Sequence, residues 1–139
     1  MEFVQVKYPD VKLLQQFIDE AGASLKSFRY FQKRPLEVIK NHACTFLLVD
    51  DEEPVAYGHL DKEDDTIWLG VAVIEAYLGL GLGVLVMKKL IDFAKENHIT
   101  TIKLSVDNNN SSAISLYKKL GFVLQEKKEG FSFYSLTVL

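Results

Sequence analysis

Residues 71–83 read Val-Ala-Val-Ile-Glu-Ala-Tyr-Leu-Gly-Leu-Gly-Leu-Gly, an apolar run that leads into glycines at alternate positions. The apolar run begins near Thr66 and places hydrophobic side chains on both faces, which predicts a strand over 66–74 that is covered on both sides. Beyond the glycines, apolar residues recur at helical spacing and predict an amphipathic helix over 81–97, with a buried face made by Val84, Met87, Leu90, Ile91 and Ala94.

The glycine loop therefore lies between a buried strand and the start of a helix. Glycine has no Cβ, so the backbone can approach a ligand closely. The helix start adds unpaired N–H groups and about half a positive charge. Together these features predict an anion site, most naturally for phosphate.

The spacing of the glycines excludes one common phosphate loop and argues against a second. A nucleoside triphosphatase loop ends in Gly-Lys-Ser/Thr, but Gly83 is followed by Val84. A dinucleotide loop has the spacing G-x-G-x-x-G, whereas this chain has G-x-G-x-G. A plain turn with spare glycines is the remaining alternative for the loop taken alone.

The elements around this loop predict an α/β fold with a mixed, mostly antiparallel sheet and helices on both faces. Asp10 is expected to cap the first helix, and Pro35 to break the second or to open a new one. The charged stretches 50–54 and 61–65 are expected to be solvated turns. We expect strands over 3–7, 44–49, 55–60, 66–74, 102–106, 122–127 and 131–138, and helices over 11–21, 24–40, 81–97 and 112–120.

The composition is that of one ordinary globular domain over residues 1–139. The net charge of −3 and the pI of about 5.6 argue against a general nucleic-acid binder. The single cysteine, Cys44, lies in an apolar run and is expected to be an inert core residue in a reducing, cytoplasmic setting. The N-terminus lacks the features of a signal peptide, and glycines break the apolar stretch 67–87, so no membrane partner is expected.

A second motif follows the predicted strand over 102–106. Asn110, Ala113 and Tyr117 lie at its end and along the next helix, and Gly121-Phe122 ends that helix. Together with the glycine loop, this segment resembles the GNAT family of N-acetyltransferases, in which Arg/Gln-x-x-Gly-x-Gly/Ala is followed by Asn-x-x-Ala, a helix tyrosine and Gly-Phe. Leu78 stands where that family has Arg or Gln.

The resemblance implies the acyl-CoA N-acyltransferase fold, with acetyl-CoA as co-substrate and no metal. It also implies that the Val71–Val73 strand holds the pantetheine arm and that Asn110 either bonds this arm or caps its helix. Lys118 and Lys119 are candidates for the 3′-phosphate. The residues expected to bind the co-substrate are Val71, Val73, Leu78, Gly79, Gly81, Leu82, Gly83, Asn110, Ala113 and Tyr117.

The resemblance implies direct attack of an amine on the thioester. Tyr117 is the candidate acid for the leaving thiolate, and backbone N–H groups along 71–73 are candidates for stabilising the developing oxyanion. His59 is the candidate base because its ordinary pKa is near neutrality. Asp61, Glu63 and Asp65 are alternatives that would act through water. His42 and His98 are expected to be surface residues at helix ends.

The acceptor is expected to be a small-molecule amine, bound by Arg29, Tyr30 and Arg34. Two arginines among aromatic residues suit an anionic group, such as the diphosphate of a nucleotide amino sugar, or an amino sugar that stacks. The alternatives are a protein or peptide acceptor and a non-catalytic acyl-CoA sensor. The closing strand pair is a candidate edge for a homodimer.

Overall fold

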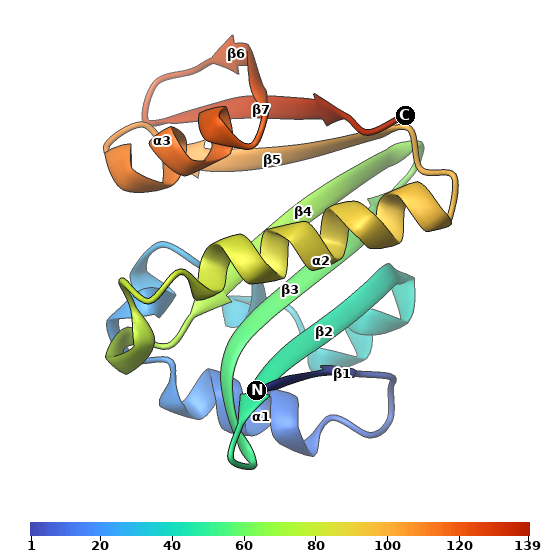
Figure 1. The fold of residues 1–139 in the computed structure, drawn as a ribbon, viewed down its shortest axis with the longest axis vertical. Coiled ribbons are helices and arrows are strands. Elements are labelled where there is room, and N and C mark those ends of the chain that lie inside the picture. The colour runs from blue at the N-terminus through green and yellow to red at the C-terminus, as the bar shows by residue number, and fades with distance from the viewer.

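The computed structural model describes all residues from 1 to 139. A seven-stranded sheet has the order β1-β2-β3-β4-β5-β7-β6 (Figure 1). Every neighbouring pair is antiparallel except β4 with β5, which is parallel, as the predicted strand–helix–strand unit requires. The strands are β1 (Glu2–Gln5), β2 (His42–Asp50), β3 (Glu53–Glu63), β4 (Thr66–Val73), β5 (Thr101–Asp107), β6 (Val123–Lys127) and β7 (Phe131–Thr137).

Helices cover both faces of this sheet, as predicted. Tyr57 on β3 stacks on Phe17, with 5.8 Å between ring centroids, whereas the next residue, Gly58, faces Val86 and Leu90. Successive residues of a strand point to opposite faces, so the helices that carry these partners lie on opposite faces, called here the α1 face and the α2 face. The α-helices are α1 (Lys12–Glu20), α2 (Leu82–Glu96) and α3 (Ser111–Lys119).

The prediction of a second helix over 24–40 is wrong. Three short 3₁₀ turns replace it: η1 (Gly22–Lys26), η2 (Tyr30–Gln32) and η3 (Leu36–Asn41). Phe28 and Phe31 pack on the ring of Tyr57, at centroid distances of 5.3 and 5.7 Å. This packing against the sheet sets the path of the segment, and Pro35 directly precedes η3, as the alternative role for that proline predicted.

Three local expectations also need correction. Asp10 does not cap α1, because Val11 occupies the N-cap position and no side chain caps that helix. The solvated turn predicted over 61–65 starts too early in the sequence. Strand β3 continues to Glu63, and Asp61 is only 3% exposed. His42 does lie at a helix end, as the C-cap of η3, but it is not a surface residue. It opens β2 and is half-buried in a hydrogen-bonded cluster, where Tyr30 and Thr45 contact its ring nitrogens.

Strands β4 and β5 pair at one register position only, Trp68 with Lys103. β4 pairs with β3 along its whole length, and β5 does the same with β7. The β4 and β5 ribbons therefore lie close at one end and part toward the other (Figure 1). On the α1 face, Trp68 and Phe133 contact each other across this divergence, with 5.6 Å between ring centroids.

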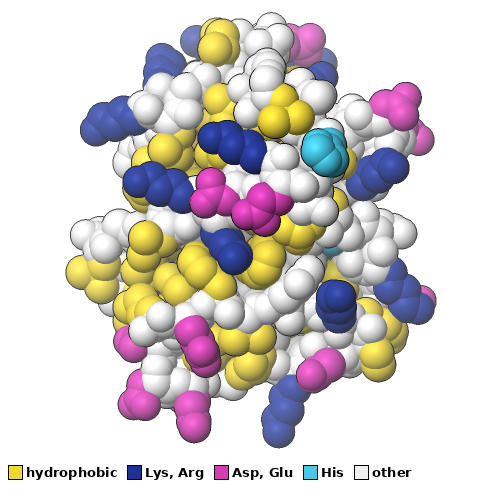
Figure 2. Space-filling view, turned by 45° about the vertical axis from the view of Figure 1, so that its right-hand side comes forward, with side chains coloured by type: hydrophobic (Ala, Val, Ile, Leu, Met, Phe, Trp, Pro, Cys, Tyr) yellow, Lys and Arg dark blue, Asp and Glu magenta, His cyan; other side chains and the backbone are white.

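The core is one cluster of buried apolar residues on both faces of the sheet. Cys44 belongs to it, as predicted, and burial raises the pKa of its thiol to about 12, which makes it a poor nucleophile. No helix is long and apolar enough to cross a bilayer. Figure 2 shows charged side chains of both signs interspersed with apolar ones on one face of the molecule.

Gly58 gives a test of the packing between β3 and α2. A Cβ at this position would collide with Cγ1 of Val86 and lie 3.0 Å from Cδ1 of Leu90. We expect Gly58→Ala to lower the free energy of unfolding by about 1–3 kcal/mol through overpacking, measured by urea denaturation. Gly83→Ala is the matched control, because its Cβ would lie 3.9 Å from the nearest atom; equal stability of the two variants would contradict this packing.

Candidate functional site

The glycine loop leaves the start of α2 open. Gly79 and Gly81 have φ of +81° and +80°, a left-handed conformation that favours glycine, and a Cβ on either would meet nothing within 4 Å. Gly81 is the N-cap of α2, and no side chain caps the helix. The first helical hydrogen bond is donated by Leu85 N–H to Gly81 O, so the amides of residues 82–84 have no partner in the fold.

The parting of β4 from β5 exposes a strand edge beside this helix start. The N–H of Ile74 donates to Val55 O on β3. Because backbone groups alternate along a strand, those of Val71 and Val73 point the other way, toward β5, where the ladder has ended. Ser24 Oγ donates to Val73 O, which ties η1 to the end of this edge.

Two cavities meet at this opening. The glycine-loop cavity, of about 520 Å³, is lined by β4, the loop, α2 and α3. The β4–β5 cavity, of about 470 Å³, lies between those strands on the α1 face. The residues that line both cavities are Ser27, Phe28, Val71, Asn110 and Tyr117.

Tyr117 lies at the junction of the two cavities. Its ring packs on Phe122, with 5.9 Å between centroids, and its hydroxyl has no hydrogen-bond partner in the fold. Burial raises the pKa of Tyr117, so the phenol is protonated at neutral pH. Asn110 caps α3 by accepting from Ala113 N–H (3.3 Å), while its amide nitrogen donates to no group of the fold.

His59 lines the β4–β5 cavity and is only 2% exposed. Its Nδ1 lies 2.6 Å from the hydroxyl of Tyr57, which has no other partner. A fully buried hydroxyl whose proton has no acceptor costs folding free energy. We therefore assign Tyr57 as the donor and Nδ1 of His59 as the acceptor. The Nε2 of neutral His59 then carries the proton. Burial, followed by the charge of His42, lowers the pKa of His59 well below its ordinary value.

Every fully buried side-chain nitrogen and oxygen has a hydrogen-bond partner. His59 Nε2 has none, so it must reach the cavity. The same holds for one oxygen of Asp61, because only Oδ2 is bonded, to the hydroxyl of Tyr30 at 2.8 Å. Asp61 is therefore a buried carboxyl with one oxygen held by the protein and one open to the β4–β5 cavity.

The pattern of the sequence holds a signal for this carboxyl. Tyr57, His59 and Asp61 alternate along β3, and register pairing places His42 opposite Asp61 and Thr45 opposite His59. Alternate residues share one face of a strand, so a polar row on the α1 face could be read from their spacing. The acidic residues that follow Asp61 obscure this row in the sequence, because a run of charged residues is typical of a solvated turn.

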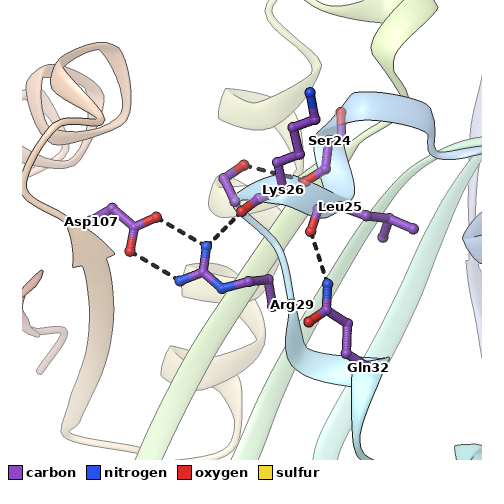
Figure 3. A network of polar contacts seen from close by, with 7 residues as sticks. Ser24, Leu25, Lys26, Arg29, Gln32 and Asp107 are labelled. Carbon is purple, nitrogen blue, oxygen red and sulfur yellow. Dashed lines mark hydrogen bonds and ion pairs between the residues drawn. The ribbon is translucent and has the colours of Figure 1, made fainter. Parts of the chain in front are cut away.

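The predicted acceptor residues Arg29, Tyr30 and Arg34 all line the β4–β5 cavity, but each already has partners within the fold. Arg29 forms a two-pronged ion pair with Asp107 at 3.1 Å and also donates to Lys26 O (Figure 3). The hydrogen bond and charge of Arg29 hold the pKa of Asp107 below its usual value. The guanidinium of Arg34 lies 4.4 Å from the Tyr30 ring centroid and donates to Tyr30 O.

The remaining predicted residues divide between the cavity and the surface. Leu78 lines the glycine-loop cavity and is 58% exposed. Leu82, Gly83 and Ala113 also line it, and Glu63 lines the β4–β5 cavity. Asp65, Lys118 and Lys119 are exposed and line neither. No group of three or more His, Cys, Asp and Glu side chains is placed to hold a metal ion.

Comparisons with known proteins agree with this geometry. Residues 10–122 match the model of the Acetyltransferase (GNAT) family. The uncharacterised N-acetyltransferase YobR of Bacillus subtilis is 35% identical over 115 residues, which cover 82% of this chain and 46% of YobR. This chain thus spans about half the length of that relative.

Solved structures share the fold. The ribosomal-protein-S18-alanine N-acetyltransferase of Escherichia coli superposes with a TM-score of 0.77 at 22% identity, over 99% of this chain and 93% of that one. The PaiA N-acetyltransferase of Thermoplasma acidophilum, solved with coenzyme A, gives 0.76 at 16% identity over 99% of both chains. The predicted acyl-CoA N-acyltransferase fold is confirmed.

The buried His59 gives a pH test of the site. Below about pH 6.5 the unfolded chain binds a proton at His59, whereas the folded chain keeps this residue neutral. The free energy of unfolding therefore decreases as the pH falls through that value. Between about pH 7.5 and about pH 5.5, this loss is about 1.4 kcal/mol.

We expect urea denaturation of His59→Asn to show a weaker pH dependence than the parent, because the Asn oxygen can still accept from Tyr57 and does not titrate. His98→Asn, a change at an exposed histidine with φ of +59°, is the matched control and should behave as the parent does. An unchanged pH dependence in His59→Asn would contradict a neutral, buried His59.

Proposed function

The chain belongs to the GNAT family of acetyltransferases, and we propose that it transfers an acetyl group from acetyl-CoA to a primary amine of a small molecule. The observation that carries the proposal is the meeting of two cavities at Tyr117. One cavity has the unpaired amides that a phosphate ligand needs, and the other has a buried carboxyl that can take a proton.

The residues of the glycine-loop cavity fit acetyl-CoA, which is the co-substrate of the family and supplies an activated acetyl thioester. The free amides of residues 82–84 would bind its pyrophosphate, where Gly79 and Gly81 leave room for close approach. The open edge of Val71 and Val73 would pair with the pantetheine arm. The free amide nitrogen of Asn110 would donate to the same arm.

Direct attack on the thioester forms a carbon–nitrogen bond and breaks the carbon–sulfur bond. The amine loses one proton and the sulfur gains one. Tyr117 would give its proton to the leaving sulfur, because its hydroxyl is protonated and has no partner in the fold, and the residue lines both cavities. The N–H of Val71 or Val73 would stabilise negative charge on the carbonyl oxygen.

The candidate bases that line the β4–β5 cavity are the buried His59 and Asp61 and the exposed Glu63. In the tautomer set by Tyr57, His59 offers an N–H to the cavity rather than a lone pair. We therefore assign proton acceptance to the open oxygen of Asp61. His59 would act as a hydrogen-bond donor that orients the acceptor substrate.

A small-molecule acceptor suits the β4–β5 cavity, whose volume of about 470 Å³ is that of an ordinary ligand pocket. An anionic acceptor, such as a nucleotide amino sugar, would have to draw Arg29 and Arg34 away from their partners in the fold. A protein N-terminus is the alternative acceptor, suggested by the name of the E. coli fold neighbour. The buried, unpaired Cys44 suits a reducing compartment such as the cytoplasm.

The test is thiol release from acetyl-CoA over a panel of polyamines, amino sugars, nucleotide amino sugars, amino acids and an alanine-terminated peptide. We expect turnover with a small amine, and a fall in kcat of about 10²–10⁴-fold in both Tyr117→Phe and Asp61→Asn, since general acids and bases contribute that much. The affinity for acetyl-CoA should not change in either variant.

Tyr134→Phe is the matched control, because this buried tyrosine of β7 lines neither cavity. Turnover with the peptide alone would support the protein acceptor. Binding of acetyl-CoA without turnover on any amine would favour the sensor. Absence of acetyl-CoA binding would overturn the proposed function.

Leu78 offers a gain-of-function test of co-substrate binding. It occupies the position where the family has Arg or Gln, and its exposed side chain lines the glycine-loop cavity. We expect Leu78→Arg to lower the Kd for CoA about 5-fold in calorimetry, because a charge-assisted hydrogen bond to phosphate is worth about 1 kcal/mol or more.

Leu80→Arg adds the same charge two residues away, at an exposed position that does not line the cavity. It should bind CoA as the parent does. Equal gains in the two variants would mean that general charge, and not a contact at residue 78, sets the affinity.

A further inference from the structure

A chain of hydrogen bonds runs from Asp61 away from the β4–β5 cavity. The hydroxyl of Tyr30 lies 2.8 Å from Asp61 Oδ2 and 2.8 Å from His42 Nε2. The other nitrogen of that imidazole, Nδ1, lies 2.8 Å from Thr45 Oγ1. Residues from η2, β2 and β3 thus form a single row that ends on the candidate base.

The direction of each bond in this row follows from the number of protons available. The hydroxyl of Tyr30 has one proton, which it donates to the Asp61 carboxylate. It must therefore accept from His42 Nε2–H, and Nδ1 of the same ring must accept from the hydroxyl of Thr45. All three donors consequently point toward Asp61.

The environment keeps this arrangement in place. Burial lowers the pKa of His42 to about 4, against the opposing charge of Asp61, so the imidazole is neutral at pH 7 and has one donor and one acceptor. Thr45 is 2% exposed and has little choice of partner. The Tyr30 ring lies 4.9 Å from that of Phe31, which limits its movement.

We propose that Tyr30, His42 and Thr45 are positioning residues that fix the Asp61 carboxyl and aim its free oxygen at the acceptor amine. This inference rests on the proposed function, because it concerns the group that accepts the proton. The hydrogen bond that Tyr30 donates holds one oxygen of the carboxyl. It also fixes the rotation of the carboxyl group, so the free oxygen stays turned to the cavity.

The far end of the row is accessible from a second opening. His42 and Thr45 line a separate cavity of about 260 Å³ between β1, η3 and β2, which shares no lining residue with the β4–β5 cavity. A small molecule can therefore reach the position of His42 without entering the site of acetyl transfer. Several ionisable groups surround the row. They are Lys7, Tyr8, Lys40 and Cys44 at this second cavity, His59 beside both rings, and Arg34, Tyr57 and Glu63 near Tyr30.

The first experiment compares kcat and KM of Tyr30→Phe with those of the parent, measured with whichever amine the parent enzyme acetylates. Loss of the hydroxyl removes the only hydrogen bond that the fold gives to the Asp61 carboxyl and keeps the packed ring. We expect kcat to fall about 10-fold or more while the KM for acetyl-CoA stays unchanged, because the base is still present but is no longer held in its orientation. A kcat equal to that of the parent would overturn the inference.

The second experiment is chemical rescue. His42→Ala should lose activity in the same way, and added imidazole should restore it in a saturable manner by occupying the vacated space from the second cavity. The double variant Tyr30→Phe with His42→Ala should gain nothing from imidazole, because the row is broken next to Asp61. Ile39→Val is the matched control, since it enlarges the same cavity and removes no hydrogen bond.

Rescue of the double variant, or the absence of rescue in a folded His42→Ala, would contradict the role assigned to the row. These outcomes are separate from a failure of the proposed function, in which the parent enzyme itself acetylates no amine.

Discussion

Strands β4 and β5 are neighbours at one residue pair, Trp68 with Lys103, and then separate. A continuous parallel ladder would have consumed the backbone groups of Val71 and Val73 and closed the space between the strands. Separation leaves the N–H groups of that edge free and opens the β4–β5 cavity beside it. The contact of Trp68 with Phe133 bridges the divergence on the α1 face, and the ion pair of Arg29 with Asp107 spans it from the η1–η2 segment.

The polar residues of the site are tolerated because the fold satisfies nearly all of their atoms. His59, Asp61 and Thr45 are almost fully buried residues, yet no fully buried side-chain nitrogen or oxygen lacks a hydrogen-bond partner. The atoms that the fold leaves unpaired are those that reach a cavity, namely one nitrogen of His59 and one oxygen of Asp61. Buried polar groups are costly when unpaired, so such atoms mark where a ligand would be bound.

The sequence predicts the parts of this molecule that depend on local pattern. Two local patterns were enough to predict the loop, the helix starts and the family: the glycines before α2, and the order of Asn110, Ala113 and Tyr117. The homodimer edge and the acceptor remain predictions. The helix expected over 24–40 failed because the aromatic rings of Phe28 and Phe31 pack on β3, which is a tertiary contact that helical spacing does not reveal.

The same limit explains Asp61 and His42. Asp61 has the residue type of a solvated turn and lies in a run of charges, whereas strand pairing with β2 and β4 buries it. His42 follows a segment that looked helical, and its role depends on Tyr30, which lies 12 residues earlier and reaches it only in the folded chain. Register between strands, and not composition, brings these groups together.

Hydrogen–deuterium exchange with and without acetyl-CoA tests whether the opening between β4 and β5 is the co-substrate site. We expect acetyl-CoA to slow exchange at the amides of Val71 and Val73 and at residues 82–84, which have no partner in the fold. Strand β2 should not respond. Binding of acetyl-CoA without protection at these amides would contradict the claim.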